Sequence, residues 1–214
     1  GCPKKEVEGT DLVAVFHIIL YKEGEEHGSA KVTDRMMEGW GIDPESLYGM
    51  ALENTAAQAP ARIRSLIYAY SGGEEALAPE EVFSERQELY VLTNPQQWNG
   101  AVAMLYPGLL QSIAEATGSS FYIMPCSIHE VMLAREGDGR DAWELQRMVM
   151  GSNRYELPPQ EILSNQVYFY DGKEQKLSLA TSPEEAQGLT GRMGMASAGY
   201  WGMGTGGMEE EMER

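Results

Sequence analysis

The amino-acid sequence predicts a single α/β domain with a mixed β-sheet and packed helices, followed by a flexible tail. The 214 residues are 43% hydrophobic and 23% charged, which is typical of a globular protein with one sizeable core. Between Arg86 and Arg135 there is no Lys or Arg, although the rest of the chain is rich in charge. A long segment so poor in charge belongs to the buried centre of a fold.

The first part of the chain predicts a hairpin and two helices. The apolar run 11–21 is too short to cross a membrane and indicates a strand covered on both faces, with residues 29–32 returning beside it. Thr33 is a typical helix N-cap, and this first helix is expected to end at Gly41. Asp43, followed by a proline, begins the second helix.

The neutral central block predicts two strands joined by a helix. Residues 89–94 and 119–125 have the apolar composition of strands. Apolar residues recur with a helical period over 99–117, where Pro107 is expected to kink or divide the helix. A helix that links two apolar strands resembles a right-handed βαβ crossover. Residues 128–135 predict a further helix.

The other segments predict shorter elements. Residues 61–70 fit either a helix or a strand, and residues 71–88, rich in Gly, Pro and Glu, indicate an exposed loop with at most one helical turn. Residues 141–150 and 159–164 predict helices. Residues 167–180 give the clearest hairpin, because two strand-like runs flank an Asp-Gly turn.

The composition changes towards the end of the chain. We expect the α/β domain to span residues 1–187 and residues 188–214 to form an acidic tail rich in Gly and Met. Such a tail buries too little apolar surface to fold by itself and is expected to be disordered. Trp201, which lies outside the predicted core, is the candidate for an aromatic side chain that binds a partner.

The net charge limits the classes of partner. It is −17, from 33 acidic and 16 basic residues, so a surface that binds nucleic acid directly is not expected. Such acidity favours solubility, and more specifically it favours a basic protein partner. The chain lacks phosphate, dinucleotide and kinase motifs, and it has too few Cys and His for a usual zinc site. We therefore expect no cofactor and no metal.

The two cysteines, Cys2 and Cys126, do not form a disulfide framework. This favours a reducing compartment, the cytoplasm, and no apolar run is long enough to span a membrane. The alternative is a lipid anchor on Cys2, with Gly1 and Cys2 as the remnant of a lipoprotein cleavage site.

Five segments resemble a known family. They read DLVAVFHIIL, WGIDPESLYGMALENT, LYVLTN, GAVAMLYPGLLQSIAEATGSSFYIMPCSIHEVML and VYFYD, and they are spread over residues 11–171. Together they resemble an uncharacterised family, a domain of unknown function, of anaerobic gut bacteria and their mobile genetic elements. The resemblance implies that this chain corresponds to a C-terminal portion and implies no activity. Cys126 stands where the family usually has Ser, which argues against an essential nucleophile there.

Cys126, His129 and Glu130 form the only constellation that could carry chemistry. As a catalytic set they would be a nucleophile, a base and a residue that orients the base. As a structural element, Ser127 to Glu130 reads S-x-x-E, a helix capping box in which Ser127 accepts a hydrogen bond from the N–H of Glu130. We prefer the structural interpretation and expect no catalytic residue, because catalytic triads are usually assembled from residues distant in sequence.

Two functions follow from these observations. The first is a non-enzymatic acidic domain for protein interaction. In its sharpest form this is an inhibitor, carried on a mobile element, of a host nucleic-acid-binding enzyme. The alternative is a cysteine-dependent hydrolase that uses Cys126 and His129.

Overall fold

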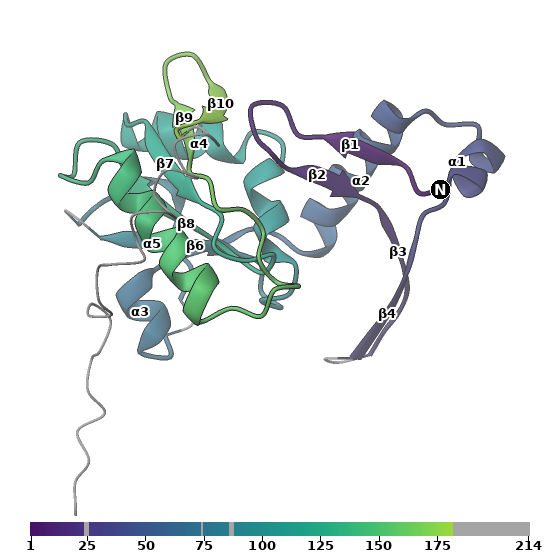
Figure 1. Cartoon of the computed structure of the whole chain (residues 1–214), viewed down its shortest axis with the longest axis horizontal. Helices are drawn as coiled ribbons and strands as arrows, with labels where there is room; N and C mark the ends of the chain where they lie inside the picture. The colour runs from purple at the N-terminus through teal and green to yellow at the C-terminus, as the bar shows by residue number, and fades with distance from the viewer. Residues whose placement is uncertain (24–25, 74, 86–87, 182–214) are drawn as a thin grey trace, which may run out of the picture.

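The structure is a computed structural model that describes residues 1–23, 26–73, 75–85 and 88–181. Figure 1 shows an N-terminal part beside a part built on a larger sheet. The N-terminal part contains β1 (Lys4–Glu6), β2 (Val13–Val15), β3 (His17–Glu23), β4 (Glu26–Lys31), α1 (Asp34–Trp40) and α2 (Pro44–Gln58). The sheet part contains β5 (Arg62–Ser65), α3 (Leu66–Tyr70), η1 (Pro79–Glu81), β6 (Leu89–Thr93), η2 (Gly100–Leu105), α4 (Leu109–Thr117), β7 (Phe121–Met124), β8 (Val131–Arg135), α5 (Ala142–Tyr155), β9 (Tyr168–Asp171) and β10 (Lys176–Leu179).

Helices α1 and α2 begin where the sequence predicts. The hydroxyl oxygen of Thr33 accepts a hydrogen bond from the N–H of Met36 at 3.3 Å. The carboxylate of Asp43 accepts one from the N–H of Ser46 at 2.8 Å. Gly41 ends α1 in the left-handed conformation, with φ at 67°, which glycine adopts without steric cost. These predictions are confirmed because caps depend on local hydrogen bonds.

The apolar run 11–21 does not have two covered faces, so that prediction is wrong. The run divides at Phe16 into β2 and β3, and alternate side chains remain exposed: Val13 by 51%, Val15 by 49% and Ile19 by 46%. The reason is that β1 with β2, and β3 with β4, form separate two-stranded sheets. A small cluster of Phe16, Val32 and Leu47 covers only one side of this ribbon. Figure 1 shows β3 and β4 as an arm that extends away from the larger sheet.

The six-stranded sheet has the order β10-β9-β7-β8-β6-β5, and the α/β fold class is confirmed. All neighbouring strands in it are antiparallel, which differs from the mixed sheet that we expected. Strands β6 and β7 are each antiparallel to β8 and therefore run parallel to each other. The predicted crossover through η2 and α4 joins these two parallel strands, with β8 inserted between them.

Residues 128–135 do not form the predicted helix; residues 131–135 form strand β8, and residues 128–130 belong to the connection before it. Leu133 lies opposite Tyr90 of β6 on one side and Ile123 of β7 on the other. A short apolar run fits a strand or a helix equally well, so the two neighbouring strands decide its conformation. The helix predicted for residues 159–164 is also absent from the described structure, where this segment forms a turn.

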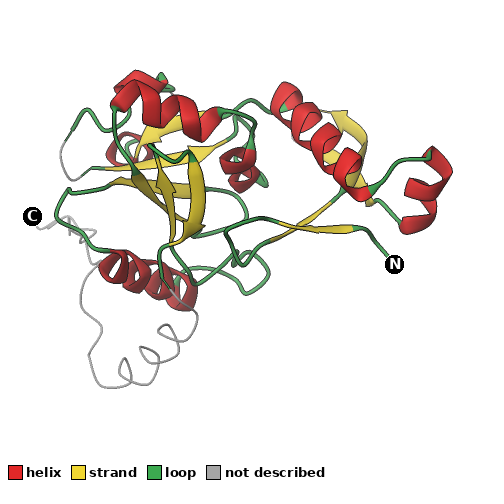
Figure 2. Cartoon of the chain, turned by 90° about the horizontal axis from the view of Figure 1, so that it is seen from above, coloured by secondary structure: helices red, strands yellow, loops and turns green. Residues whose placement is uncertain are grey.

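Helices cover both faces of the sheet, as Figure 2 shows. The larger core cluster lies on one face and includes residues of η2 and α4 together with Phe121, Ile123 and Tyr168. The smaller cluster lies on the other face and includes Leu145 and Val149 of α5. The helix predicted over residues 99–117 is divided around Pro107, as expected, into η2 and α4.

A carboxylate joins the N-terminal part to the sheet. Asp11 accepts hydrogen bonds from the hydroxyl of Tyr168 at 2.6 Å and from the hydroxyl of Ser164 at 2.8 Å. Leu12 packs against the larger core cluster. A Cβ at Gly9 would lie 2.1 Å from the carbonyl oxygen of Leu177 in β10, so the backbones approach closely there. The loop between β1 and β2 therefore docks on the edge of the sheet formed by β9 and β10.

In the part of the chain that the structure describes, no helix has both the length and the apolar character needed to cross a membrane. The predicted tail, residues 188–214 with Trp201, lies outside the described residues, as do the last residues of the predicted domain.

Candidate functional site

Residues 125–130 form the connection between β7 and β8, and this connection carries the predicted constellation. The hydroxyl oxygen of Ser127 accepts hydrogen bonds from the N–H of His129 at 3.0 Å and of Glu130 at 3.2 Å. The N–H of Ser127 donates to the carbonyl of Glu130 at 3.3 Å. The predicted bond from Glu130 to Ser127 is thus present, but it closes a turn before a strand. Serine stabilises such turns by the same hydrogen bonds that cap helices.

Segments distant in sequence fix this connection. The N–H of Ile128 donates to the carbonyl of Glu161 at 2.9 Å, and the carbonyl of Ile128 accepts from the N–H of Ala101 at 3.2 Å. The hydroxyl of Thr93, at the end of β6, donates to the carbonyl of His129 at 2.7 Å. Because the backbone is held from both sides, the side chains of Cys126, His129 and Glu130 have defined surroundings.

Cys126 is a core residue in this structure. Its side chain is 5% exposed and packs with Met124, Leu145 and Val149 under α5. Burial raises the pKa of the Cys126 thiol to about 12, and the negative charges of Glu130 and Glu156 act in the same direction. Only the thiolate is a strong nucleophile, so this environment disfavours chemistry at Cys126.

His129 has partners other than the thiol. Its Nδ1 accepts a hydrogen bond from the N–H of Asn99 at 3.1 Å, which assigns the ring proton to Nε2. Nε2 lies 3.9 Å from a carboxylate oxygen of Glu161. Among the described hydrogen bonds, none joins His129 to Cys126. The two ring nitrogens of His129 therefore face Asn99 and Glu161.

Glu130 faces a feature that the sequence did not reveal. It lines an open pocket of about 340 Å³ together with Arg64 of β5 and residues of α3. Burial raises the pKa of Glu130, while the positive charge of Arg64 and then the His129 ring work in the opposite direction. Arg64 carries no local sequence signal, because the pairing of β5 with β6, and of β6 with β8, brings it to Glu130.

No group of three or more His, Cys, Asp or Glu side chains that could hold a metal ion occurs within the described residues. The polar side chains that line the pocket are those of Arg64, Gln97 and Glu130. A guanidinium, an amide and a single carboxylate suit hydrogen bonding rather than metal coordination.

An antiparallel six-stranded sheet with helices on both faces, and an open pocket at one edge of the sheet, define this chain as an α/β protein. The chain belongs to a family of unknown function, DUF5688, whose family model matches residues 2–172. This finding confirms the resemblance to a family of unknown function that residues 11–171 indicated. No match to the chain is found among curated proteins or among solved structures.

We expect Cys126 to resist iodoacetamide in the folded protein near neutral pH, whereas the exposed Cys2 reacts. A thiol with a pKa near 12 instead of 9.0 has about a thousandfold less thiolate at neutral pH, and burial also excludes the reagent. Mass spectrometry should therefore show one fast modification, and a second one only after unfolding in urea.

The variant Cys2→Ser is the matched control and should show no fast modification in the folded state. Fast labelling of Cys126 in this variant would contradict the buried placement of the thiol. It would favour the alternative function, a hydrolase that uses Cys126.

Proposed function

We propose that this protein is a non-enzymatic interaction domain whose negatively charged surface binds a basic protein partner. The observation that carries the proposal is the net charge of −17 on 214 residues. A surface of one sign steers a partner of the opposite sign and raises the rate of association. A more specific form of the proposal is an inhibitor, carried on a mobile element, that occupies the basic channel of a host nucleic-acid-binding enzyme.

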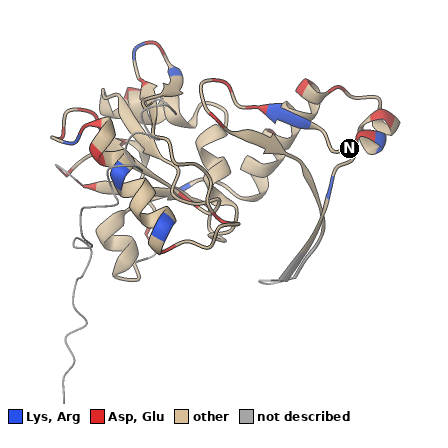
Figure 3. Ribbon diagram, viewed as in Figure 1, with Lys and Arg blue, Asp and Glu red and all other residues tan. Residues whose placement is uncertain are grey.

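The distribution of charge supports a broad acidic surface. Figure 3 shows Asp and Glu on α1, on α2 and on the loops around the sheet, with fewer Lys and Arg between them. Glu38 of α1, Glu53 of α2 and Glu136 after β8 are all exposed. A nucleic-acid-binding enzyme presents a basic channel, and exposed carboxylates can occupy positions that phosphates otherwise take.

The alternative, a cysteine-dependent hydrolase, has weaker support. The buried thiol of Cys126, its raised pKa and the separate partners of His129 all argue against it. No observation on the described residues favours a nucleophile elsewhere.

The test is capture of basic nucleic-acid-binding proteins from bacterial extract on the immobilised chain, at low and at high salt. We expect the captured partner to be released as sodium chloride rises from about 50 to about 300 mM, because salt screens exposed charges over roughly a Debye length. Duplex DNA added at low salt should release the same partner by competition.

A triple variant, Glu38→Gln, Glu53→Gln and Glu136→Gln, should capture less of this partner, since it removes exposed charges without changing the core. The matched control, Arg35→Gln, Arg147→Gln and Lys173→Gln, changes the same number of exposed residues in the opposite electrostatic direction and should capture at least as much. Capture that depends on neither salt nor these charges would reject the proposal.

A further inference from the structure

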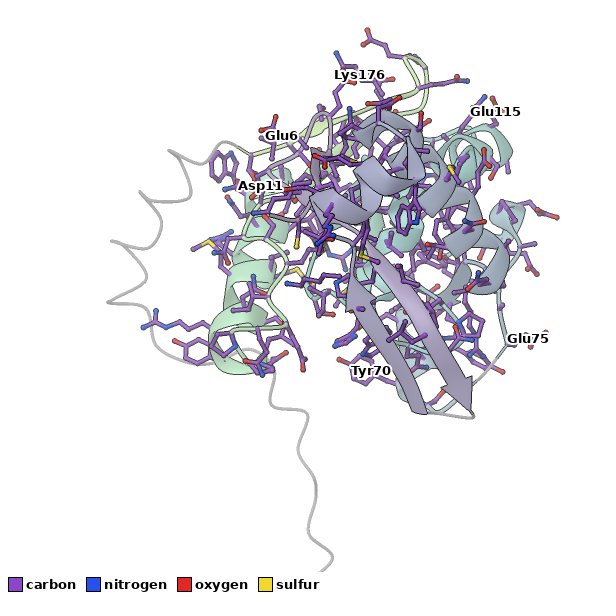
Figure 4. All side chains as sticks on the ribbon, turned by 90° about the vertical axis from the view of Figure 1, so that its right-hand side faces the viewer. Glu6, Asp11, Tyr70, Glu75, Glu115 and Lys176 are labelled. Carbon is purple, nitrogen blue, oxygen red and sulfur yellow. The ribbon has the colours of Figure 1, made fainter. Side chains whose placement is uncertain are left out.

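An open pocket lies between α3 and the edge of the sheet. Its volume is about 340 Å³, at the small end of the range for ligand pockets in proteins. Its lining includes the polar side chains of Arg64, Gln97 and Glu130 and the apolar side chains of Leu66, Tyr70 and Val91. Figure 4 shows Tyr70 and Glu75 at the end of the molecule away from Lys176. Tyr70 is 82% exposed, so the aromatic side of the pocket is open to solvent.

Arg64 is the buried polar group of this pocket. Its side chain is only 7% exposed, and its Nη1 donates to the carbonyl of Gly73 at 3.0 Å. Its Nε is buried and has no acceptor within the described part of the chain. A buried guanidinium with an unused donor costs free energy, so its retention requires a reason.

Glu130 contributes the opposite charge to the same pocket. Its carboxylate is partly buried and is close enough to Arg64 for the two charges to interact. Among the ion pairs of the described residues, however, none joins Arg64 to Glu130. Two opposite charges therefore line one small pocket without neutralising each other by direct contact.

We propose that this pocket binds a free α-amino acid with an apolar side chain. The guanidinium of Arg64 holds the α-carboxylate, since guanidinium and carboxylate match in shape and charge. The carboxylate of Glu130 holds the α-ammonium group. Leu66 and Tyr70, which line the pocket, contact the side chain of the ligand.

The pair of opposite charges selects against simpler ligands. A plain carboxylate is attracted by Arg64 but repelled by Glu130, and a plain amine experiences the reverse. A zwitterion satisfies both groups at once, so discrimination comes from repulsion as well as attraction. This proposal is independent of the acidic surface described above, because it concerns a single concave site of two charges.

The test is isothermal titration calorimetry of the full chain with three probes. L-leucine carries both charged groups, N-acetyl-L-leucine keeps only the carboxylate, and L-leucinamide keeps only the ammonium group. We expect L-leucine to bind about tenfold or more tightly than either derivative, as expected for the loss of one charge-assisted contact. Absence of binding at millimolar L-leucine, or equal binding of a derivative, would overturn the proposal.

Two variants assign the charges. Glu130→Gln should weaken L-leucine binding and lower the ratio of its affinity to that of N-acetyl-L-leucine, because the amide no longer repels a plain carboxylate. Arg64→Gln should lower the ratio of L-leucine to L-leucinamide in the same way. Each ratio compares two ligands on the same variant. Partial unfolding lowers both apparent affinities by the same factor, so it does not change the ratio.

The matched controls are Glu174→Gln and Arg147→Gln, which remove exposed charges outside the pocket lining. Both should leave all three affinities unchanged. Ratios in Glu130→Gln or Arg64→Gln that equal those of the parent would show that the assignment of the charges is wrong. Salt-dependent capture of a basic protein should be the same in the pocket variants and in the parent, which separates this test from that of the acidic surface.

Discussion

Replacing Phe121 with alanine is expected to lower the free energy of unfolding by about 3–5 kcal/mol, the usual cost of removing a fully buried aromatic ring. Phe121 lies on the interior strand β7, and its exposed fraction is 0%. Its ring stacks on Tyr170, with 5.4 Å between centroids, and lies 5.5 Å from the ring of Phe83. Alanine loses both ring contacts. They are not replaced, because a tightly packed interior relaxes only partly around the missing ring.

Urea unfolding followed by circular dichroism measures this loss as a lower midpoint at an unchanged slope. Ile67→Ala is the matched control, because Ile67 is 74% exposed on α3. This control should stay within about 0.5 kcal/mol of the parent. If Phe121→Ala lowered the free energy of unfolding by less than about 1 kcal/mol, the result would contradict the full burial of this ring in the core.

Replacing Gly100 with alanine is expected to cost about 3 kcal/mol, the upper end for one methyl group forced into a packed site. A Cβ at Gly100 would lie 2.2 Å from the hydroxyl oxygen of Thr93, 2.5 Å from the carbonyl oxygen of His129 and 2.8 Å from the backbone nitrogen of Asn94. Two of these atoms belong to the backbone and cannot rotate away. The methyl group would separate Thr93 from the His129 carbonyl and displace the connection that carries Glu130.

Thermal unfolding of Gly100→Ala and Gly49→Ala compares the two sites directly. Gly49 lies exposed within α2, and a Cβ there would meet no atom within 4 Å. Alanine in a helix interior is favoured over glycine by about 0.5–1 kcal/mol, so the melting temperature of Gly49→Ala should rise. A melting temperature for Gly100→Ala at or above that of the parent would contradict the close approach seen at Gly100.

The parts of the fold that could be predicted are those set by short-range interactions. The caps at Thr33 and Asp43, the division of a helix at Pro107 and the hairpin of β9 with β10 depend on neighbouring residues only. Each is encoded by a hydrogen-bonding side chain or by a fixed dihedral angle. The sequence therefore contains enough information to place these features.

The parts that could not be predicted depend on long-range packing. Ser127 forms the expected bond with the N–H of Glu130, yet pairing with β6 and β7 draws the following residues into a strand. Phe83 lies in a segment predicted to be an exposed loop, but its ring is buried in the main core. The same holds for the site: Glu130 could be recognised as a candidate, whereas its neighbour Arg64 is identified only by the sheet topology.

The contact of Asp11 with Tyr168 spans 157 positions of the chain. During synthesis on a ribosome, the early hairpins leave the exit tunnel well before this tyrosine is added. The carboxylate thus remains hydrated through most of translation and exchanges water for the phenol only when β9 emerges. Since the entropic cost of closing a loop grows only slowly with its length, this late closure costs little more than a short one would, and it attaches the loop between β1 and β2 to β9.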